Sequence, residues 1–260
     1  MEREDAARIS ACVVTYNSCY EVFDALASLE AAALEMPMSV YVTDNASADG
    51  TCEWISKAFP FIRVIENSKN RGYGAAHNAV LPLLDSEYHL IMNPDIVFKP
   101  ETLKRMADYL TDHPEAVIAT PRVLNADGTE QRLPKQQPTL RYLAGGVLRR
   151  FGKVFDKWRA VYTGARMDLT RPAEVAFATG CFMLIRTRVF VKLKGFDESF
   201  FLYMEDSDLS RRAMNEGRII YCPDCTVTHH WKRASHRNWR AGAAHIRSAL
   251  RFFLKWGWRL

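Results

Sequence analysis

The sequence predicts an α/β fold with a mostly parallel central sheet covered by helices, followed by a helical extension at the C-terminus. In the first half of the chain, short apolar runs alternate with segments whose apolar residues recur at helical spacing. Such alternation is typical of parallel strands, because each parallel strand needs a long, usually helical, connection to the next. The chain has 260 residues, of which 48% are hydrophobic, so one large domain with a sizeable core is expected.

Five strands and four helices are predicted before residue 121. The strand sequences, in chain order, are ISACVVTY, MSVYVTDN, FIRVIEN, YHLIMNPD and AVIAT. The helices that follow the first four strands are expected at about residues 22–34, 49–59, 74–84 and 100–113. The strands are apolar along nearly their whole length, as expected when helices cover both faces of a sheet.

The chain changes character at residues 121–172, which are basic, contain several glycines and prolines, and show weak periodicity. One helix is expected there, near residues 140–151, and long irregular stretches inside a domain are commonly functional loops. Regular structure resumes at CFMLIRTRVF, and two further short strands are predicted at RIIYC and CTVTHH. A last helix is expected from about Trp239 to the C-terminus.

The charge is unevenly distributed along the chain. The net charge of +5 is too small to indicate a nucleic-acid partner, but no acidic residue follows Asp224. The cations beyond that point are Lys232, Arg233, Arg237, Arg240, Arg247, Arg251, Lys255 and Arg259. This local excess favours an anionic surface or a phosphate group as partner. The segment HIRSALRFFLKWGWRL places apolar residues on one helical face, so it is either an amphipathic helix lying on a membrane or a terminal helix packed on the core.

Cysteine usage and the N-terminus predict a cytoplasmic protein, with peripheral contact to the inner face of the membrane as an option. The six cysteines are scattered through apolar segments, as expected of reduced thiols rather than a disulfide framework. The first ten residues are polar and acidic, so no signal peptide is predicted, and no run of about 18 apolar residues could span a membrane. Cys222 and Cys225, followed by His229, have the spacing of half a zinc site, although buried core cysteines are the alternative.

Polar residues follow the predicted strands at their carboxyl ends. Thr15, Tyr16 and Asn17 close the first strand, Asp44 and Asn45 the second, and Asn93 and Asp95 the fourth. Ligands of open parallel sheets bind at this edge, so these side chains predict one shared cleft. Asp44 could accept a hydrogen bond from a uracil or thymine ring and Arg71 could donate one, while Tyr16 offers a stacking face. Asp95 is an oxygen ligand suited to Mg²⁺ or Mn²⁺ on a diphosphate.

A second group of acids lies in FFLYMEDSDLSRR. Asp208 is expected at a helix N-terminus, paired with Arg212 four residues later. Glu205 and Asp206 follow an aromatic stretch, where burial and mutual repulsion would raise carboxyl pKa values toward those useful to a general base.

Five blocks taken together resemble the family 2 nucleotide-sugar glycosyltransferases. They are VVTYNS, VTDNASADGT, NRGYGAAHN, IMNPDI and TGCFMLIRTRVFVKLKGFDESFFLYMEDSDLSRR. The resemblance covers about residues 8–235, and the most similar branch comprises bacterial rhamnosyltransferase-like enzymes of surface-polysaccharide assembly. It implies a GT-A fold in a single domain over residues 1–238, with a nucleotide-binding part at 8–120 and an acceptor and catalytic part at 121–238. Residues 239–260 would form a basic amphipathic helix.

The resemblance also implies roles for individual residues. The positions that it assigns to the nucleotide sugar are Thr15, Tyr16, Asn17, Asp44, Asn45, Arg71, Gly72, Asn93 and Gly180. Asp95 matches the last acid of a metal-binding DxD motif, whose first acid is replaced here by Asn93. His229 would lie near the metal or diphosphate, as would Arg233. Asp206, with Glu205 beside it, matches the catalytic base.

The implied reaction is an inverting transfer from a dTDP- or UDP-linked sugar, L-rhamnose being favoured through the family branch. The base would deprotonate a hydroxyl of a saccharide or lipid-linked acceptor, and that oxygen would attack the anomeric carbon through an oxocarbenium-like transition state. Two alternatives remain open at this point. One is a sugar-nucleotide pyrophosphorylase, although TYNSCYEVF lacks the glycine-rich basic loop expected after its first strand. The other is a non-catalytic or zinc-binding scaffold.

Overall fold

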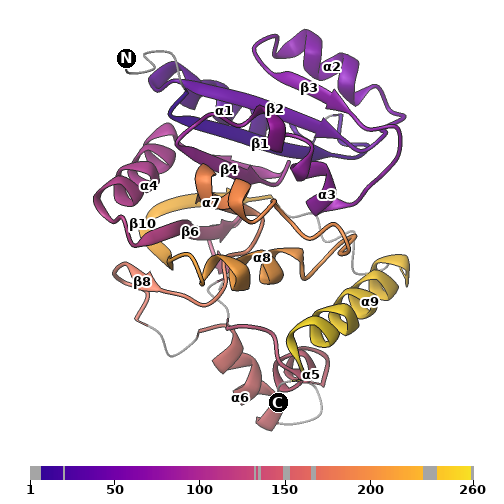
Figure 1. Ribbon diagram of the computed structural model, residues 1–260, viewed down its shortest axis with the longest axis vertical. Coiled ribbons are helices and arrows are strands. Elements are labelled where there is room, and N and C mark those ends of the chain that lie inside the picture. Colours follow the sequence, from indigo (N-terminus) through magenta and orange to yellow (C-terminus); the bar gives the residue numbers. More distant parts are fainter. Residues whose placement is uncertain are drawn as a thin grey trace.

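Strands from both halves of the chain form one mixed sheet with helices on its two faces (Figure 1). The computed structural model describes residues 7–19, 21–131, 133, 136–148, 153–164, 168–230 and 239–258. Within these residues the sheet has ten strands, ordered β3-β2-β1-β4-β9-β6-β10-β5, with β7 beside β6 and β8 beside β10. The predicted α/β class, a mostly parallel central sheet covered by helices, is confirmed.

The N-terminal strands are parallel, as the alternating pattern predicted. They are β1 (Ile9–Thr15), β2 (Met38–Asp44), β3 (Arg63–Glu66) and β4 (Tyr88–Met92). The connecting helices are α1 (Phe23–Glu35), α2 (Thr51–Ala58) and α3 (Tyr73–Asn78), with a 3₁₀ turn at Leu81–Leu83. The helix expected at 74–84 is split in this way because Pro82 lacks the amide hydrogen that would continue the helical ladder.

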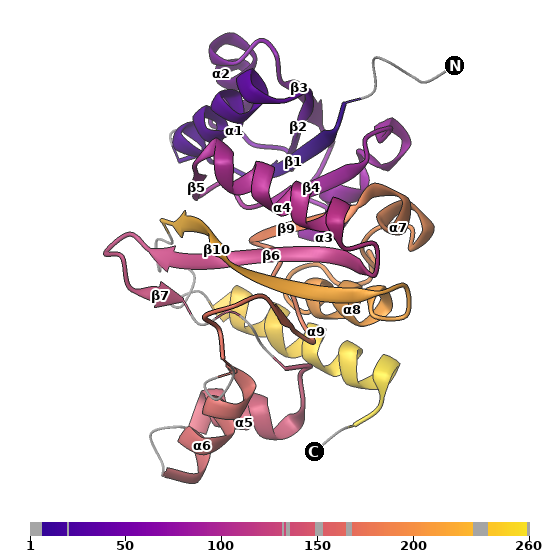
Figure 2. The same ribbon diagram turned by 90° about the vertical axis from the view of Figure 1, so that its left-hand side faces the viewer.

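The C-terminal half completes the sheet with strands of both directions. Its strands are β5 (Ile96–Phe98), β6 (Ala116–Asn125), β7 (Glu130–Gln131), β8 (Ala173–Glu174), β9 (Phe182–Arg186) and β10 (Arg218–His229). β9 lies between β4 and β6 and is antiparallel to both, whereas β10 is parallel to β6. Figure 2 shows β6 and β10 side by side across the molecule. Of the ten described strands, β1–β4, β6 and β10 point one way, so the sheet remains mostly parallel.

The remaining helices cover the sheet or extend from it. They are α4 (Pro100–Asp112), α5 (Leu140–Leu148), α6 (Lys153–Tyr162), α7 (Thr187–Lys192), α8 (Glu205–Ala213) and α9 (Trp239–Trp256). The single helix expected near 140–151 is replaced by the pair α5 and α6, which projects from the body in both views (Figures 1 and 2). The two strands expected at RIIYC and CTVTHH are one strand, β10, with an irregularity between Cys222 and Thr226.

The apolar core has a layer on each face of the sheet. Successive side chains of β9 alternate between them: Phe182 and Leu184 belong to the cluster that includes α1 and α4, and Met183 and Ile185 to the cluster that includes α7 and α8. All four are fully buried, and burial of each such side chain contributes about 1.5–3 kcal/mol. This two-sided burial explains why the strands read as continuous apolar runs.

Helix α9 packs on the body, as one of the two sequence-based alternatives proposed. Phe252 and Phe253 are buried against Phe200 and Met204 in the segment before α8. The opposite face of α9 is apolar but exposed, with Ile246, Leu250 and Leu254 at 66%, 47% and 76% of their full accessibility. Among the described residues, no helix is both long and apolar enough to cross a bilayer.

Candidate functional site

The ends of β1 and β2 hold a buried carboxylate. Thr15 faces Asp44 in the sheet register, and its Oγ1 donates to Asp44 Oδ1 over 2.7 Å. Ser47 donates its backbone N–H to Oδ2 over 2.7 Å and its hydroxyl to Oδ1 over 2.5 Å. Asp44 is 1% exposed. The carboxylate thus accepts three hydrogen bonds from Thr15 and Ser47, and the Cys52 thiol hydrogen-bonds to it as well.

Asn45 organises the loop that follows β3. Its Oδ1 accepts from the Asn67 side chain and from the Arg71 backbone N–H, and its Nδ2 donates to the Gly72 carbonyl, each over 3.2 Å. Gly72 has φ +85°, and a Cβ there would lie 2.1 Å from the Phe201 carbonyl oxygen. This close approach joins the loop to the segment before α8, so glycine is required at the junction of the two halves.

Tyr16, Asn17 and Arg71 are the more accessible residues of this edge. Asn17 has φ +52° and connects two loops by hydrogen bonds. Its N–H donates to Ser47 Oγ over 2.7 Å, and its Oδ1 accepts from the Ala48 N–H over 2.9 Å. Tyr16 is 53% exposed, which leaves its ring available for stacking. Arg71 forms a half-exposed ion pair of 3.0 Å with Glu198.

Asp95 and His229 come from distant parts of the chain and meet at the junction of β5 and β10. The pairing of Ile96 with His229 and a hydrogen bond of 2.8 Å from the His230 N–H to the Asp95 carbonyl fix the two backbones. His229 Nε2 lies 3.1 Å from Asp95 Oδ1, and its Nδ1 lies 3.2 Å from Gln131 Oε1. A ring nitrogen and a carboxylate oxygen this close together are both atoms that divalent metal ions accept as ligands.

Glu205 and Asp206 begin α8 after a strained turn. Tyr203 and Met204, at φ +69° and +66°, are consecutive left-handed residues with side chains, each costing roughly 1–3 kcal/mol. Glu205 is buried, whereas Asp206 is half-buried and its Oδ2 accepts from the Gly180 N–H over 3.2 Å. Strain of this kind is typical of functional sites, where it fixes the direction of the side chains that follow.

A cavity of about 280 Å³ joins these elements. The sequence-predicted residues that line it are Asn93, Gly180, Glu205, Asp206 and His229. Asp95 reaches the same place through His229. By contrast, Thr15, Asp44 and Asn45 do not line this cavity and connect to it through the contact between Gly72 and Phe201. Arg233 lies outside the described residues.

The cavity also contains residues that sequence analysis missed. Tyr73, Gln131 and Tyr203 line it. Tyr162, at the end of α6, is not in the lining, but burial, followed by the charge of Asp206, raises its pKa above the ordinary value. Tyr73 and Tyr203 lie within the quoted blocks NRGYG and FLYMED, so attention to aromatic residues beside glycines and acids could have found them. Gln131 and Tyr162 come from the weakly periodic region and left no such signal.

The two adjacent acids differ in burial. Burial, followed by repulsion from Asp206, raises the Glu205 pKa well above its ordinary value. Asp206 is more accessible and faces the cavity. Adjacent carboxyl groups in different environments are characteristic of acid–base sites.

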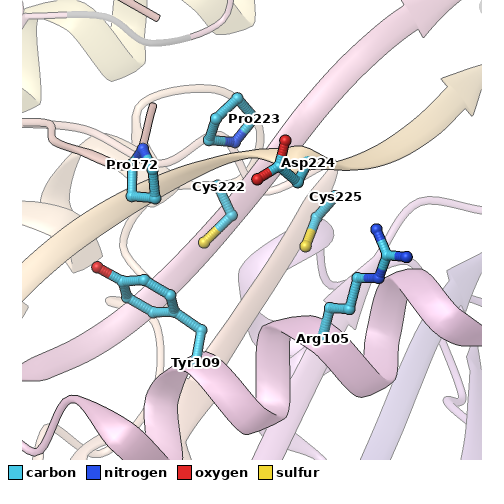
Figure 3. Close-up of a pocket in the computed structure, with 7 residues that line it drawn as sticks. All are labelled: Arg105, Tyr109, Pro172, Cys222, Pro223, Asp224 and Cys225. Carbon is cyan, nitrogen blue, oxygen red and sulfur yellow. The ribbon is translucent and has the colours of Figure 1, made fainter. Parts of the chain in front are cut away.

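A second cavity, of about 420 Å³, lies between α4 and the irregularity of β10. Figure 3 shows the sulfur atoms of Cys222 and Cys225 directed toward α4, from which Arg105 and Tyr109 extend. Both cysteines are buried. The described residues supply no group of three His, Cys, Asp or Glu side chains able to hold a metal, and His229 faces Asp95 instead. The described part therefore does not provide the zinc site considered for Cys222, Cys225 and His229.

Comparisons with known proteins identify the family of the chain. Residues 10–194 match the model of the family described as glycosyl transferase family 2. The chain is 30% identical over 249 residues to N-acetylglucosaminyl-diphospho-decaprenol L-rhamnosyltransferase of Mycobacterium tuberculosis, covering 90% of this chain and 78% of that protein. It is 25% identical over 198 residues to rhamnosyltransferase WbbL of Escherichia coli, covering 70% and 71%.

Solved structures show the same fold. The mannosyltransferase PcManGT from Pyrobaculum calidifontis, in complex with GDP-Man and Mn²⁺, superposes with a TM-score of 0.66 at 18% identity, covering 95% of this chain and 64% of that one. TarS 1–349 of S. aureus in complex with UDP gives a TM-score of 0.60 at 20% identity, covering 86% and 61%. With the family match over more than half of its length, the chain belongs to glycosyl transferase family 2 and is a nucleotide-sugar-dependent glycosyltransferase.

Proposed function

We propose that this protein transfers a sugar, L-rhamnose in the first instance, from a nucleoside-diphosphate donor to a hydroxyl of a lipid-linked saccharide, with inversion at the anomeric carbon. The observation that carries the proposal is the single cavity lined by Asn93, Gly180, Asp206 and His229. Residues from β4, the approach to β9, α8 and β10 converge there, as a site that holds a donor and an acceptor together requires.

Asp206 is the proposed general base. It faces the cavity, and the Gly180 N–H stabilises its carboxylate form through a hydrogen bond. Glu205 is less suited to the role because it is buried, and burial raises its pKa and disfavours the carboxylate form that accepts a proton. In the proposed reaction Asp206 accepts the proton of the acceptor hydroxyl as that oxygen attacks the anomeric carbon, and the nucleoside diphosphate leaves from the opposite face.

The donor nucleoside is proposed to bind at the ends of β1 and β2. The Asp44 carboxylate is the proposed acceptor for the imide N–H of uracil or thymine, and the exposed Tyr16 ring suits stacking on the base. Arg71 would leave its partner Glu198 to donate to the base or the ribose. The half-exposed ion pair between them costs little to open, about 1 kcal/mol or less.

A divalent cation, Mg²⁺ or Mn²⁺, is proposed to bind between Asp95 and His229. Asp95 Oδ1 is buried and accepts no hydrogen bond from the described residues, and an oxygen with an imidazole nitrogen forms a donor set that Mn²⁺ accepts. When bound, the cation would neutralise the charge that develops on the departing diphosphate. Two protein ligands leave room for diphosphate oxygens and water, which agrees with Asn93 at the position of the first acid. The Mn²⁺ in the mannosyltransferase structure supports this assignment.

The names of two relatives support the sugar and the acceptor. The Mycobacterium tuberculosis protein is named for rhamnosyl transfer to a diphospho-decaprenol-linked N-acetylglucosamine, and the Escherichia coli protein is named a rhamnosyltransferase. dTDP-rhamnose and a polyprenyl-diphosphate-linked saccharide are accordingly the first substrates to test, in the synthesis of a cell-surface polysaccharide.

A polyprenyl-linked acceptor would require the protein to meet the cytoplasmic face of the membrane, and α9 is proposed to make that contact. Its exposed residues Ile246, Leu250 and Leu254 lie on a helix that also carries cations, a combination that suits an anionic bilayer. The helix lies against the rim of the cavity. Ser248 Oγ donates to the Leu202 carbonyl over 2.8 Å, and the His245 ring lies 4.9 Å from that of Tyr203.

The test of the reaction is a transfer assay with dTDP-rhamnose, UDP-sugars and a short-chain polyprenyl-diphosphate saccharide. Asp206→Asn should abolish transfer while leaving dTDP affinity in the presence of Mn²⁺ within about twofold of the unmodified protein. Asp224→Asn, a carboxyl at the other cavity, is the matched control and should retain full transfer. Transfer by Asp206→Asn at the unmodified rate would eliminate this residue as the base.

The membrane contact is tested by co-sedimentation with anionic phosphatidylglycerol vesicles. Leu250→Asp should weaken sedimentation at least tenfold, because it places a charge in the face that meets the lipid. Leu34→Asp, which alters an 86% exposed leucine on α1, should leave sedimentation unchanged. Equal sedimentation of the two variants would rule out α9 as the contact.

A further inference from the structure

We propose that Tyr73 is a positioning residue that aims the carboxylate of Asp206 through the backbone of Gly180. The inference rests on the proposed role of Asp206 as base. Neither the family match nor the named relatives assign any function to Tyr73. In this scheme Tyr73 does not touch the reacting atoms, because it acts on Asp206 only through the backbone of Gly180.

Two hydrogen bonds define the connection. The Tyr73 hydroxyl donates to the Gly180 carbonyl oxygen over 2.7 Å, and the Gly180 N–H donates to Asp206 Oδ2 over 3.2 Å. The first bond restrains the rotation of the Gly180 backbone about its Cα. The Gly180 N–H in the second bond therefore has a fixed direction, so the Asp206 carboxylate is oriented before the acceptor saccharide binds.

Gly180 fits between the two side chains because it has none of its own. A Cβ at this position would lie 3.3 Å from Tyr73 Cε1 and 3.5 Å from Asp206 Cβ. The Tyr73 ring and the Asp206 side chain therefore approach the same backbone atoms from two elements, α3 and α8. A larger residue would push one of them away and lengthen one of the two hydrogen bonds.

The Tyr73 ring is itself held in place. It packs edge-on against His77 at 4.5 Å and against Phe196 at 6.1 Å between ring centroids. His77 is fully buried, and neither ring nitrogen has a hydrogen-bond partner among the described residues. Burial, and to a lesser extent His89, lowers the His77 pKa well below its ordinary value, so the neutral imidazole serves as a packing surface. The Tyr73 N–H also donates to the Phe201 carbonyl over 3.0 Å, which anchors the start of α3.

Tyr73 remains a donor throughout the working pH range. Burial, followed by the neighbouring Cys181 and Glu205, raises its pKa well above the ordinary value, so the phenol keeps its hydrogen. A protonated and immobile hydroxyl is suited to fixing a carbonyl and unsuited to acting as a base. The expected loss on its removal is one of alignment, and small misplacements of a catalytic group can cost as much as 100-fold in rate.

The first experiment compares Tyr73→Phe with Tyr88→Phe in the full-length protein. Tyr88 is a buried tyrosine whose hydroxyl lies 3.0 Å from Thr111 Oγ1, and it does not line the cavity, which makes it the control. Tyr73→Phe should lower kcat about tenfold with the donor KM within twofold of the unmodified protein, whereas Tyr88→Phe should retain kcat. Equal kcat for all three proteins would overturn the proposal.

The second experiment needs no sugar transfer and keeps the proposal distinct from the proposed function. In ¹⁵N-labelled protein the Gly180 amide proton, bonded to a carboxylate, should resonate downfield. It should move upfield in both Tyr73→Phe and Asp206→Asn and stay in place in Tyr88→Phe. An unmoved Gly180 resonance in Tyr73→Phe would overturn the positioning role even if Asp206 proves to be the base. A moved resonance with undiminished transfer in Asp206→Asn would instead refute the proposed base.

Discussion

Asp208 is expected to be the main polar anchor between α8 and α9, and its replacement by Asn tests this directly. The residue is fully buried and accepts from Arg212 Nε at 2.8 Å, Lys255 Nζ at 2.7 Å and Trp256 Nε1 at 2.8 Å. Asp208→Asn keeps the shape of the side chain but removes the charge that balances two cations. The cost therefore reports the loss of electrostatic pairing rather than the loss of packing.

The magnitude follows from burial of the partners. Removing one member of a buried ion pair costs about 3–5 kcal/mol. The Lys255 side chain is 33% exposed, so solvent screens part of its interaction, and the expected cost lies at the lower end, about 3 kcal/mol. For a domain of this size, about 3 kcal/mol corresponds to a fall in Tm of roughly 6–12 °C.

The assay is urea unfolding followed by far-UV circular dichroism, together with thermal unfolding. Lys192→Gln is the matched control, because its ion pair with Glu216 lies at the surface with the lysine 66% exposed, and it should cost less than about 1 kcal/mol. A free energy of unfolding for Asp208→Asn that matches that of Lys192→Gln would refute the anchoring role.

Three further outcomes are expected. Because the pKa of Glu205 is raised in the folded state, the folded protein binds more protons than the unfolded chain, and its stability falls as pH rises above the unfolded-state pKa. Glu205→Gln should therefore reduce the decline of Tm between pH 5 and 8. Gly72→Ala should abolish nucleotide-induced thermal stabilisation, because its Cβ would clash with the backbone; a normal shift would contradict this. Excess oxidised glutathione should form a disulfide between Cys222 and Cys225, detected by mass spectrometry as a loss of two hydrogens. If both thiols can still be alkylated after this treatment, the prediction is wrong.

The strand–helix pattern predicted the N-terminal half well because local sequence determines it. β1 and β4 are buried along their whole length and β2 along most of it, while β3 is short with a charged residue at each end; each following helix has its own periodicity. The position of β9 could not be predicted in this way. Its insertion between β4 and β6 depends on pairings with strands about 65 to 95 residues away, and an apolar run carries no mark of its direction. The irregularity of β10 between Cys222 and Thr226 was likewise interpreted as a break between two separate strands.

The candidate site was predicted in part for similar reasons. Asp95 and His229 were both singled out by residue type, but their separation of 3.1 Å depends on the pairing of β5 with β10. Asn45 and Asn17 were predicted to contact the nucleotide, which stays a prediction; the hydrogen bonds that the structure shows for them join neighbouring loops. Small polar residues at strand ends can serve either purpose, and only the surrounding backbone distinguishes them. Tyr162 escaped notice because its segment lacks periodicity.

The central place of β9 has a consequence for how the protein is made. During synthesis, β1 to β4 and β6 all leave the ribosome before β9, so the exposed edges of β4 and β6 have no partner until residue 186 has been translated. Unpaired strand edges recruit other chains. A fragment ending before β9 should therefore aggregate rather than fold. In a protein whose strand order in the sheet follows the order of synthesis, truncation at the same point would leave no gap in the sheet.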